Sequence, residues 1–329
     1  MKIHHPTSVA VIVAAALTTP SSLLVADASV FFHEPDSHAS NRLPDHVAAR
    51  LGLIAGRGRL ERIHPESIAA CTQGNGHPGN CEVQVHSANG DERTLHLDPF
   101  SWRTSAYQLC VQDRDGNLTP ITPGPETTLI GFDDDNNKVA ASIYNGQITA
   151  EILGQNGTWF IDSLDTSGSY AVFTNNDINN DPEKTCSVFP PSARDLVELG
   201  VDSHDDITSR QLTNDHHRPL RHPYLRGSNR LLTGPLPAVA ELAIDSDYEY
   251  YVNHGSDVYA VQARIESVIN AMNVQYETEV GITHAITTII VRTVDDPNPY
   301  TSTNAGFLLN QFRLEWDANQ AGTPRDVAQ

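Results

Sequence analysis

Four cysteines are the residues of this chain best suited to covalent or metal chemistry: Cys71, Cys81, Cys110 and Cys186. Cys71 and Cys81 flank the turn-rich stretch TQGNGHPGN, which can close as a small disulfide loop. Their spacing is not C-x-x-C, which disfavours a zinc ribbon. Cys110 and Cys186 are then either a second bridge or two free thiols. This use of cysteine fits an oxidising compartment.

Two further groups contain residue types that bind metals. Asp133, Asp134 and Asp135 form an acidic run, for which we weigh a calcium site against a solvated turn and favour the turn. His216, His217 and His222 lie in residues 209–232, which hold five Arg against one acid. Adjacent histidines seldom face one ion together, and two prolines discourage a helix, so we favour an exposed, protease-accessible linker there.

The composition excludes some classes of function. The chain has 329 residues, with 21 Lys and Arg against 41 Asp and Glu, and a formal net charge of −20. A general nucleic-acid binder needs a basic face, so that class is disfavoured. The length favours two domains.

The N-terminus resembles an export signal. Residues 8–17 (SVAVIVAAAL) are an apolar run too short to span a bilayer, and Ala26-Asp27-Ala28 is an A-x-A cleavage pattern. We expect cleavage after Ala28 and a secreted, extracellular or periplasmic protein with no membrane span after signal removal. A buried N-terminal strand or helix is the alternative.

Two regions with different patterns follow. Residues 91–173 hold short apolar runs separated by turns, and residues 139–153 alternate like a hairpin that turns at Asn145-Gly146. Beyond the linker, residues 238–244 predict a strand, and Ser256-Asp257 caps a helix with one apolar stripe. Residues 282–294 predict a central strand, and a second helix is expected from about Thr303, with an apolar face that includes Leu309, Phe312 and Trp316.

The order of these elements resembles the reprolysin-type zinc metalloproteases, the ADAM and snake-venom group of metzincins. Residues 240–247 (AELAIDSD) resemble that family's opening strand, residues 269–276 (INAMNVQY) its first long helix, and residues 307–316 (FLLNQFRLEW) its second helix. Residues 325–329 (RDVAQ) are similar to its His-Asp-x-Ala-Gln segment, with Arg325 in place of the His. Residues 139–142 and 157–161 resemble phrases of its propeptide.

This resemblance implies an α+β or α/β protein. Together with the residue patterns above, we expect a signal peptide (1–28), a β-rich propeptide-like domain (29–208), a basic linker (209–235) and an incomplete metzincin-like domain of strand, helix, strand and helix (236–329). The family's zinc motif, H-E-x-x-H-x-x-G-x-x-H, is absent from the sequence. The resemblance therefore implies either a truncated product or a fragment, with no catalytic residue of its own.

Three metal-ligating residues are implied by the resemblance alone. Cys186, in the segment EKTCSV, matches the propeptide cysteine whose thiolate occupies the zinc position in the latent form. Ser187 stands where the family pattern has Gly, and a disulfide to Cys110 is the alternative for Cys186. Glu241 and Asp326 match positions that bind a structural calcium, with a sheet-face Glu and a helix-capping Asp as the alternative.

The function implied is that of an exported proprotein of a zinc endopeptidase. Its partners would be a protein or peptide substrate and a processing protease acting at residues 209–232, and its cofactors zinc and calcium. Two other functions remain open. One is a secreted binding or adhesion module without enzymatic activity, and the other is a propeptide-type inhibitor of another metalloprotease.

Overall fold

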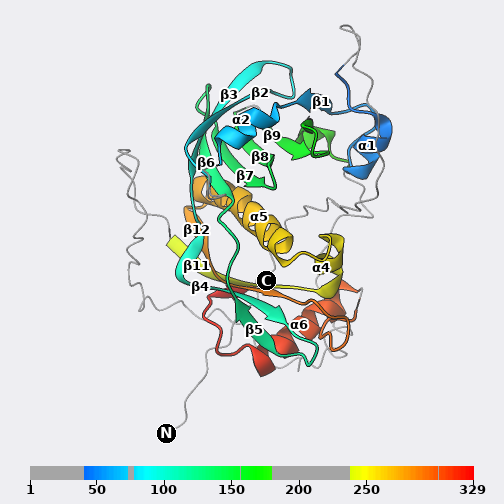
Figure 1. The fold of residues 1–329 in the computed structure, drawn as a ribbon, viewed down its shortest axis with the longest axis vertical. Coiled ribbons are helices and arrows are strands. Elements are labelled where there is room, and N and C mark those ends of the chain that lie inside the picture. Colours follow the sequence, from blue (N-terminus) through cyan, green and yellow to red (C-terminus); the bar gives the residue numbers. More distant parts are fainter. Residues whose placement is uncertain (1–40, 73–77, 156, 180–237, 303) are drawn as a thin grey trace, which may run out of the picture.

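Most of the strands before residue 180 pair into one antiparallel sheet. A computed structural model describes residues 41–72, 78–155, 157–179, 238–302 and 304–329 (Figure 1). The predicted signal sequence, the predicted linker and Cys186 therefore lie outside the described residues. The sheet has eight strands in the order β1-β10-β9-β8-β7-β6-β3-β2, joined through antiparallel pairs. Its strands are β1 (Arg59–Arg62), β2 (Cys81–His86), β3 (Glu92–Pro99), β6 (Thr128–Asp133), β7 (Lys138–Tyr144), β8 (Gln147–Gly154), β9 (Gly157–Ser163) and β10 (Ser169–Thr174).

The hairpin predicted across residues 139–153 is present. β7 and β8 pair from Lys138↔Leu153 to Tyr144↔Gln147, so two residues connect the strands. Asn145 and Gly146 have φ of 51° and 72°, and the left-handed conformation at both positions matches the twist of the flanking strands. Asn-Gly is the dipeptide that adopts this turn most readily, because neither residue is strongly penalised at positive φ.

One face of the eight-stranded sheet closes over a short helix. The sheet curls around α2 (Pro65–Ala70), and Ile68 of this helix is fully buried among apolar side chains from most of the strands (Figure 1). A second short helix, α1 (Asp45–Arg50), packs through Val47 and Ala48 near Phe173 of β10. The apolar side chains on this face of the sheet therefore pack against α2 in a core formed within the N-terminal region.

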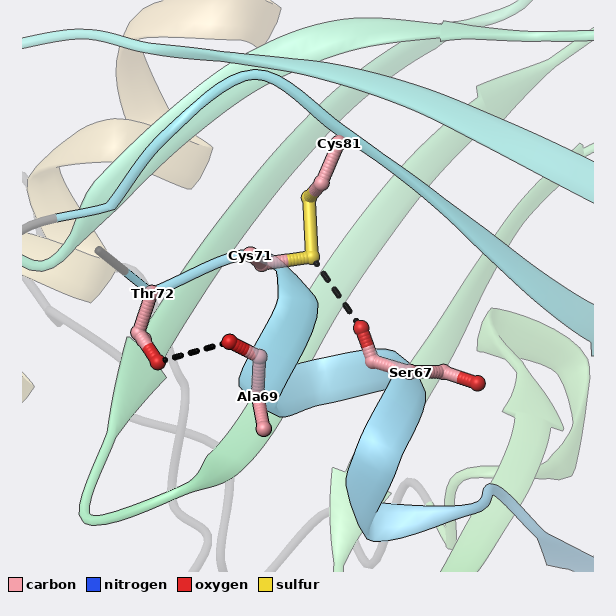
Figure 2. The surroundings of a disulfide bond; sticks show 5 residues. All are labelled: Ser67, Ala69, Cys71, Thr72 and Cys81. Carbon is pink, nitrogen blue, oxygen red and sulfur yellow. Dashed lines mark hydrogen bonds between the residues drawn. A yellow bond between two sulfur atoms is a disulfide. The ribbon is translucent and has the colours of Figure 1, made fainter. Parts of the chain in front are cut away.

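A disulfide ties α2 to the edge strand β2. Cys71, directly after α2, bonds to Cys81 at the start of β2, with 5.0 Å between the two Cα atoms (Figure 2). The Cys71 carbonyl accepts a hydrogen bond from the Gly79 N–H, and the Thr72 hydroxyl donates to the Ala69 carbonyl (Figure 2). The bond therefore closes the loop that the spacing of the two cysteines predicts.

We expect loss of this disulfide to lower the free energy of unfolding by about 2–3 kcal/mol, because the closed loop of about ten residues restricts the unfolded chain. Denaturant titration of a Cys71→Ala, Cys81→Ala variant measures the loss. Reductant should destabilise the wild type and a Cys110→Ala variant to the same extent, since Cys110 is a free thiol. Unfolding that is insensitive to reductant would contradict the prediction.

The second sheet is built from both regions of the chain. It has five strands in the order β13-β11-β12-β4-β5. β11 (Ala238–Ser246), β12 (Ile282–Val291) and β13 (Val327–Ala328) come from the C-terminal region, and β4 (Arg103–Gln112) and β5 (Leu118–Ile121) come from the N-terminal one. β11 is parallel to β12 and β13, β12 is parallel to β4, and only β4 and β5 pair antiparallel. The sequence did not predict that β4 and β5 of the N-terminal region would join the sheet of the C-terminal region.

Two helices cover opposite faces of the five-stranded sheet. The long helix α5 (Val258–Glu279) packs on one face through Val261, Ile265, Ile269 and Met272, and α6 (Ala305–Asn319) packs on the other through Trp316 and Phe312. Successive side chains of β4 point to opposite faces of the sheet: Leu109 packs in the core beneath α5, and Cys110 packs on the α6 side. Because α5 also contacts β6, β7 and β8, it lies between the two sheets (Figure 1).

The observed α+β architecture agrees with the predicted class, and the second region has the expected order of strand, helix, strand and helix. Asp257 caps α5 by accepting from the Tyr259 N–H, whereas Asn304 caps α6. Leu309 is 38% exposed, so the buried face of α6 is narrower than predicted and centres on Trp316. A further helix, α4 (Tyr248–Asn253), follows β11. No helix of the described residues is long and apolar enough to cross a membrane.

Candidate functional site

Glu241 and Asp326 lie side by side, although 85 residues separate them. The Asp326 Oδ2 accepts the Glu241 N–H at 2.8 Å, and the Asp326 N–H donates to the Glu241 carbonyl at 2.8 Å. Asp326 is therefore not a helix cap. Its carboxylate holds the segment before β13 against β11. One of its oxygens already accepts a hydrogen bond, so a calcium ion there would share the carboxylate with the Glu241 backbone.

The two histidines of the C-terminal region lie at opposite ends of the second sheet. His284 is near the start of β12, where its Nδ1 and the Asn273 Oδ1 are 2.9 Å apart. His254 follows α4, which leaves the far end of the parallel strand β11, and its Nδ1 lies 2.8 Å from the Tyr250 carbonyl. Burial lowers the pKa of both imidazoles. The pair does not fit a shared zinc ion.

Among the residues that the structure describes, no group of three or more His, Cys, Asp or Glu side chains has the arrangement of a metal site. The acidic run at residues 133–135 forms a hydrogen-bonded turn, in which the Asp133 Oδ1 accepts from the Asp135 and Asn137 N–H groups. Cys110 is a buried free thiol, and burial raises its pKa.

A buried ionic cluster lies where β11 and β12 end. The Arg292 guanidinium donates to both carboxylate oxygens of Asp245, at 2.9 and 2.7 Å, and to the Glu315 Oε1 at 2.9 Å. The Tyr300 hydroxyl donates to the Asp245 Oδ2 at 2.7 Å. The side chains of Asp245 and Arg292 are 0% and 2% exposed. Burial raises the pKa of Asp245, and the hydrogen bonds from Arg292 oppose that shift.

A small pocket opens beside this cluster. Its volume is about 360 Å³, and it is lined by Gly116, Leu118, Arg292, Glu315, Asn319 and Gln320. These residues come from the β4–β5 turn, the start of β5, the position after β12, and the C-terminal part of α6 with the residue that follows it. Ligands of parallel sheets commonly bind at the carboxyl ends of strands. Here, however, Arg292 is already paired with the carboxylates of Asp245 and Glu315. We therefore assign it a structural role rather than a role in binding a ligand.

The face of α5 toward the N-terminal region carries buried polar side chains. Glu266 accepts two hydrogen bonds from the Arg103 guanidinium, at 2.7 and 3.0 Å. Asn270 accepts from the Trp102 indole N–H at 2.8 Å and donates to the Leu129 and Ala141 carbonyls at 2.9 and 2.8 Å. One helical turn onward, Asn273 bonds instead to β12, through the backbone N–H and carbonyl of His284. The two asparagines therefore hold different regions of the chain against α5.

Sequence reasoning missed both the ionic cluster and the role of Asn270. A signal for the cluster was present, because Asp245 and Arg292 directly follow two largely apolar runs, where a charged side chain is unusual. Such charges have to be paired with each other when the strands are neighbours. For Asn270 and Asn273, which stand three residues apart, nothing in the sequence shows which segment each side chain meets.

Comparison with known proteins finds a match over one part of the chain. Residues 237–326 match the Reprolysin_5 model of metallo-peptidase family M12. The match runs from the start of β11 through α6 to Asp326, and it covers less than a third of the chain. A search of the curated proteins found no match. The comparisons support a reprolysin-like family for residues 237–326, and through it a metallopeptidase relationship.

Proposed function

We propose that this chain is the exported precursor of a zinc metalloendopeptidase of the M12 type. The observation that carries the proposal is the match over residues 237–326, which spans the strand, helix, strand and helix that the resemblance implies. In this proposal residues 1–28 are a signal peptide and residues 29–208 a propeptide. Residues 209–235 are the linker that a processing protease cuts, and residues 236–329 are the first half of a catalytic domain.

Zinc would supply an activated water that attacks a peptide carbonyl. This chain lacks the H-E-x-x-H motif, and its described residues show no cluster suited to the ion, so no catalytic step is assigned to them. Cys186 is proposed as the thiolate that blocks the zinc position in the latent form. Glu241 and Asp326, which lie in contact, are proposed as two ligands of a structural calcium ion.

Residues 1–329 alone are expected to bind no stoichiometric zinc in the C-terminal region and to cleave no peptide. Zinc content by elemental analysis and cleavage of a peptide library, with and without chelator, measure both quantities. If the coding frame continues beyond codon 329 into a zinc motif, the extended protein should bind zinc and become active once the linker is cut. Chelator-sensitive proteolysis by residues 1–329 would contradict the assignment of inactivity, and a stop codon there would contradict the precursor.

A further inference from the structure

The turn that joins β4 to β5 ends in an acceptor sequence for an N-linked sugar. Asn117-Leu118-Thr119 has the form Asn-x-Thr in which x is not Pro, and Asn156-Gly157-Thr158 is the other such triplet of the sequence. In an exported protein this triplet can carry an oligosaccharide on its Asn, and the site has to lie at the surface because the sugar is bulky and hydrated. Asn156 lies outside the described residues, so the structure bears on Asn117 alone.

One carboxylate organises the backbone of this turn. The Asp113 Oδ1 accepts the Asp115 N–H at 2.9 Å and the Asn117 N–H at 2.8 Å, and the Asp113 N–H donates to the Asn117 carbonyl at 2.8 Å. Gly116 takes the positive φ of 84° that closes the turn. Asp113, Arg114, Asp115 and Asn117 are all exposed. The turn therefore presents Asn117 to solvent on a backbone with a defined geometry.

The surroundings of Asn117 leave space for a large group. Leu118, the next residue, lines the small pocket beside α6. Successive side chains of a chain that enters a strand point to opposite sides, so the Asn117 side chain points away from this pocket. β5 also pairs with β4 alone among the described strands, and the five-stranded sheet ends there (Figure 1). A sugar on Asn117 therefore extends into solvent at the edge of the sheet.

The amide nitrogen of Asn117 can take a sugar without loss of the turn. Its Nδ2 lies 3.2 and 3.4 Å from the two carboxylate oxygens of Asp113, and it carries two hydrogen atoms. In the transfer, Nδ2 loses one proton and forms a bond to C1 of the first sugar of a lipid-linked oligosaccharide. The bond from C1 to the diphosphate oxygen breaks, and the lipid diphosphate leaves with that electron pair. The remaining N–H can still donate to Asp113.

The same turn offers a basic residue to proteases. Arg114 is exposed and stands three residues before Asn117. Exposed loop tips are preferred sites of proteolytic cleavage. A trypsin-like protease has to contact several residues on both sides of the bond that it cleaves, so a bulky group on Asn117 obstructs its approach to the bond after Arg114.

We propose that Asn117 carries an N-linked oligosaccharide that shields the β4–β5 turn from cleavage after Arg114. The proposal rests on the export of the chain, which is one part of the proposed function, and it does not depend on peptidase activity. Residues 209–232, the predicted linker, contain no Asn-x-Ser or Asn-x-Thr triplet. The shield therefore protects the turn and leaves the predicted linker open to a processing protease.

The modification is tested by translating the full chain in vitro with and without microsomes. In an Asn156→Gln background, the microsomes should add one mobility shift that endoglycosidase H removes. Adding Asn117→Gln or Thr119→Ala should abolish the shift, whereas Thr119→Ser keeps the triplet and should retain it. An unshifted Asn156→Gln product that is nevertheless protected from added protease inside the microsomes would overturn the proposal.

Protection from added protease reports export separately from glycosylation. A chain that stays unprotected has failed to enter the microsomes, which contradicts the export part of the proposed function and not the acceptor site. The same full chain behind an unrelated secretory signal then tests Asn117 by itself. A protected but unshifted Asn156→Gln product behind that signal would overturn the assignment of Asn117.

The shielding is tested on the Asn156→Gln protein secreted from a glycosylating cell. One half of the sample is treated with endoglycosidase under native conditions, and both halves are then digested with trypsin. Cleavage after Arg114, read from fragments that begin at Asp115, should be severalfold slower with the sugar in place. Cleavage within residues 209–232 should proceed equally in both halves, and Asn117→Gln should behave as the treated half. Equal rates of cleavage after Arg114 in the two halves would overturn the shielding.

Discussion

Replacing Arg292 by alanine is expected to lower the free energy of unfolding by about 3–5 kcal/mol. Arg292 is the cation of the cluster at the ends of β11 and β12, and it bonds to Asp245 and Glu315. Without it, the fully buried Asp245 carboxylate keeps only the hydroxyl of Tyr300 among these partners. An unpaired buried charge costs several kcal/mol, whereas the pair itself contributes much less.

Denaturant titration followed by circular dichroism measures this effect. The matched control is Arg313→Ala, which removes an exposed pair with Asp317 on α6 and should change the free energy of unfolding by less than about 1 kcal/mol. A double variant, Arg292→Met with Asp245→Leu, should lose less than Arg292→Ala because it leaves no unpaired Asp245 carboxylate. A loss below about 1 kcal/mol for Arg292→Ala would show that the cluster is hydrated or able to rearrange.

Local patterns predicted the elements that depend on local chemistry. The hairpin at Asn145-Gly146, the strand before Ser246 and the helix capped by Asp257 all follow from turn residues, alternation or a side-chain cap within a few positions. The short helices α1, α2 and α4 were missed. Each has six residues, which is too few for a helical period to show in the sequence.

The placement of β4 could not be predicted in the same way. The alternation of apolar and polar residues in β4 predicts a strand, but a strand of either sheet would show the same alternation. The parallel pairing of Cys110 with Ile290 joins positions 180 residues apart. Only the tertiary contacts decide it, such as Leu109 against the α5 core. The predicted division at the linker rests on composition, and composition carries no information about which sheet a strand joins.

Buried Glu151 makes the stability of the protein depend on pH. Glu151 lies on β8, where it faces α5 and accepts a hydrogen bond from the Gln275 amide. Burial raises the pKa of Glu151 from 4.5 to about 7, and this single hydrogen bond opposes the shift. Between pH 4.5 and 7 the folded protein therefore retains a proton that the unfolded chain has released. Its free energy of unfolding must fall as the pH rises through this window.

The size of the effect follows from the shift. One pKa unit corresponds to about 1.4 kcal/mol, so the stability lost through Glu151 between pH 4.5 and 8 is about 3 kcal/mol. Below pH 4.5 both states hold the proton, and above pH 7 both have released it, so the penalty is constant outside the window. Glu151 belongs to the N-terminal region and Gln275 to α5 of the C-terminal region. The cost of ionising Glu151 in the folded protein therefore weakens the contact between these two regions.

Glu151→Gln tests this directly, because a glutamine keeps the oxygen that accepts from Gln275 but has no charge to bury. The variant and the wild type should be about equally stable at pH 4.5, and the variant should be about 3 kcal/mol more stable at pH 8. Urea titrations at four pH values between 4.5 and 8 give the two curves. Glu92→Gln, at an exposed position of β3, serves as the control and should follow the wild type. If the Glu151→Gln curve runs parallel to the wild-type curve across the whole range, then Glu151 is hydrated in the folded protein and the helix α5 does not seal it from water.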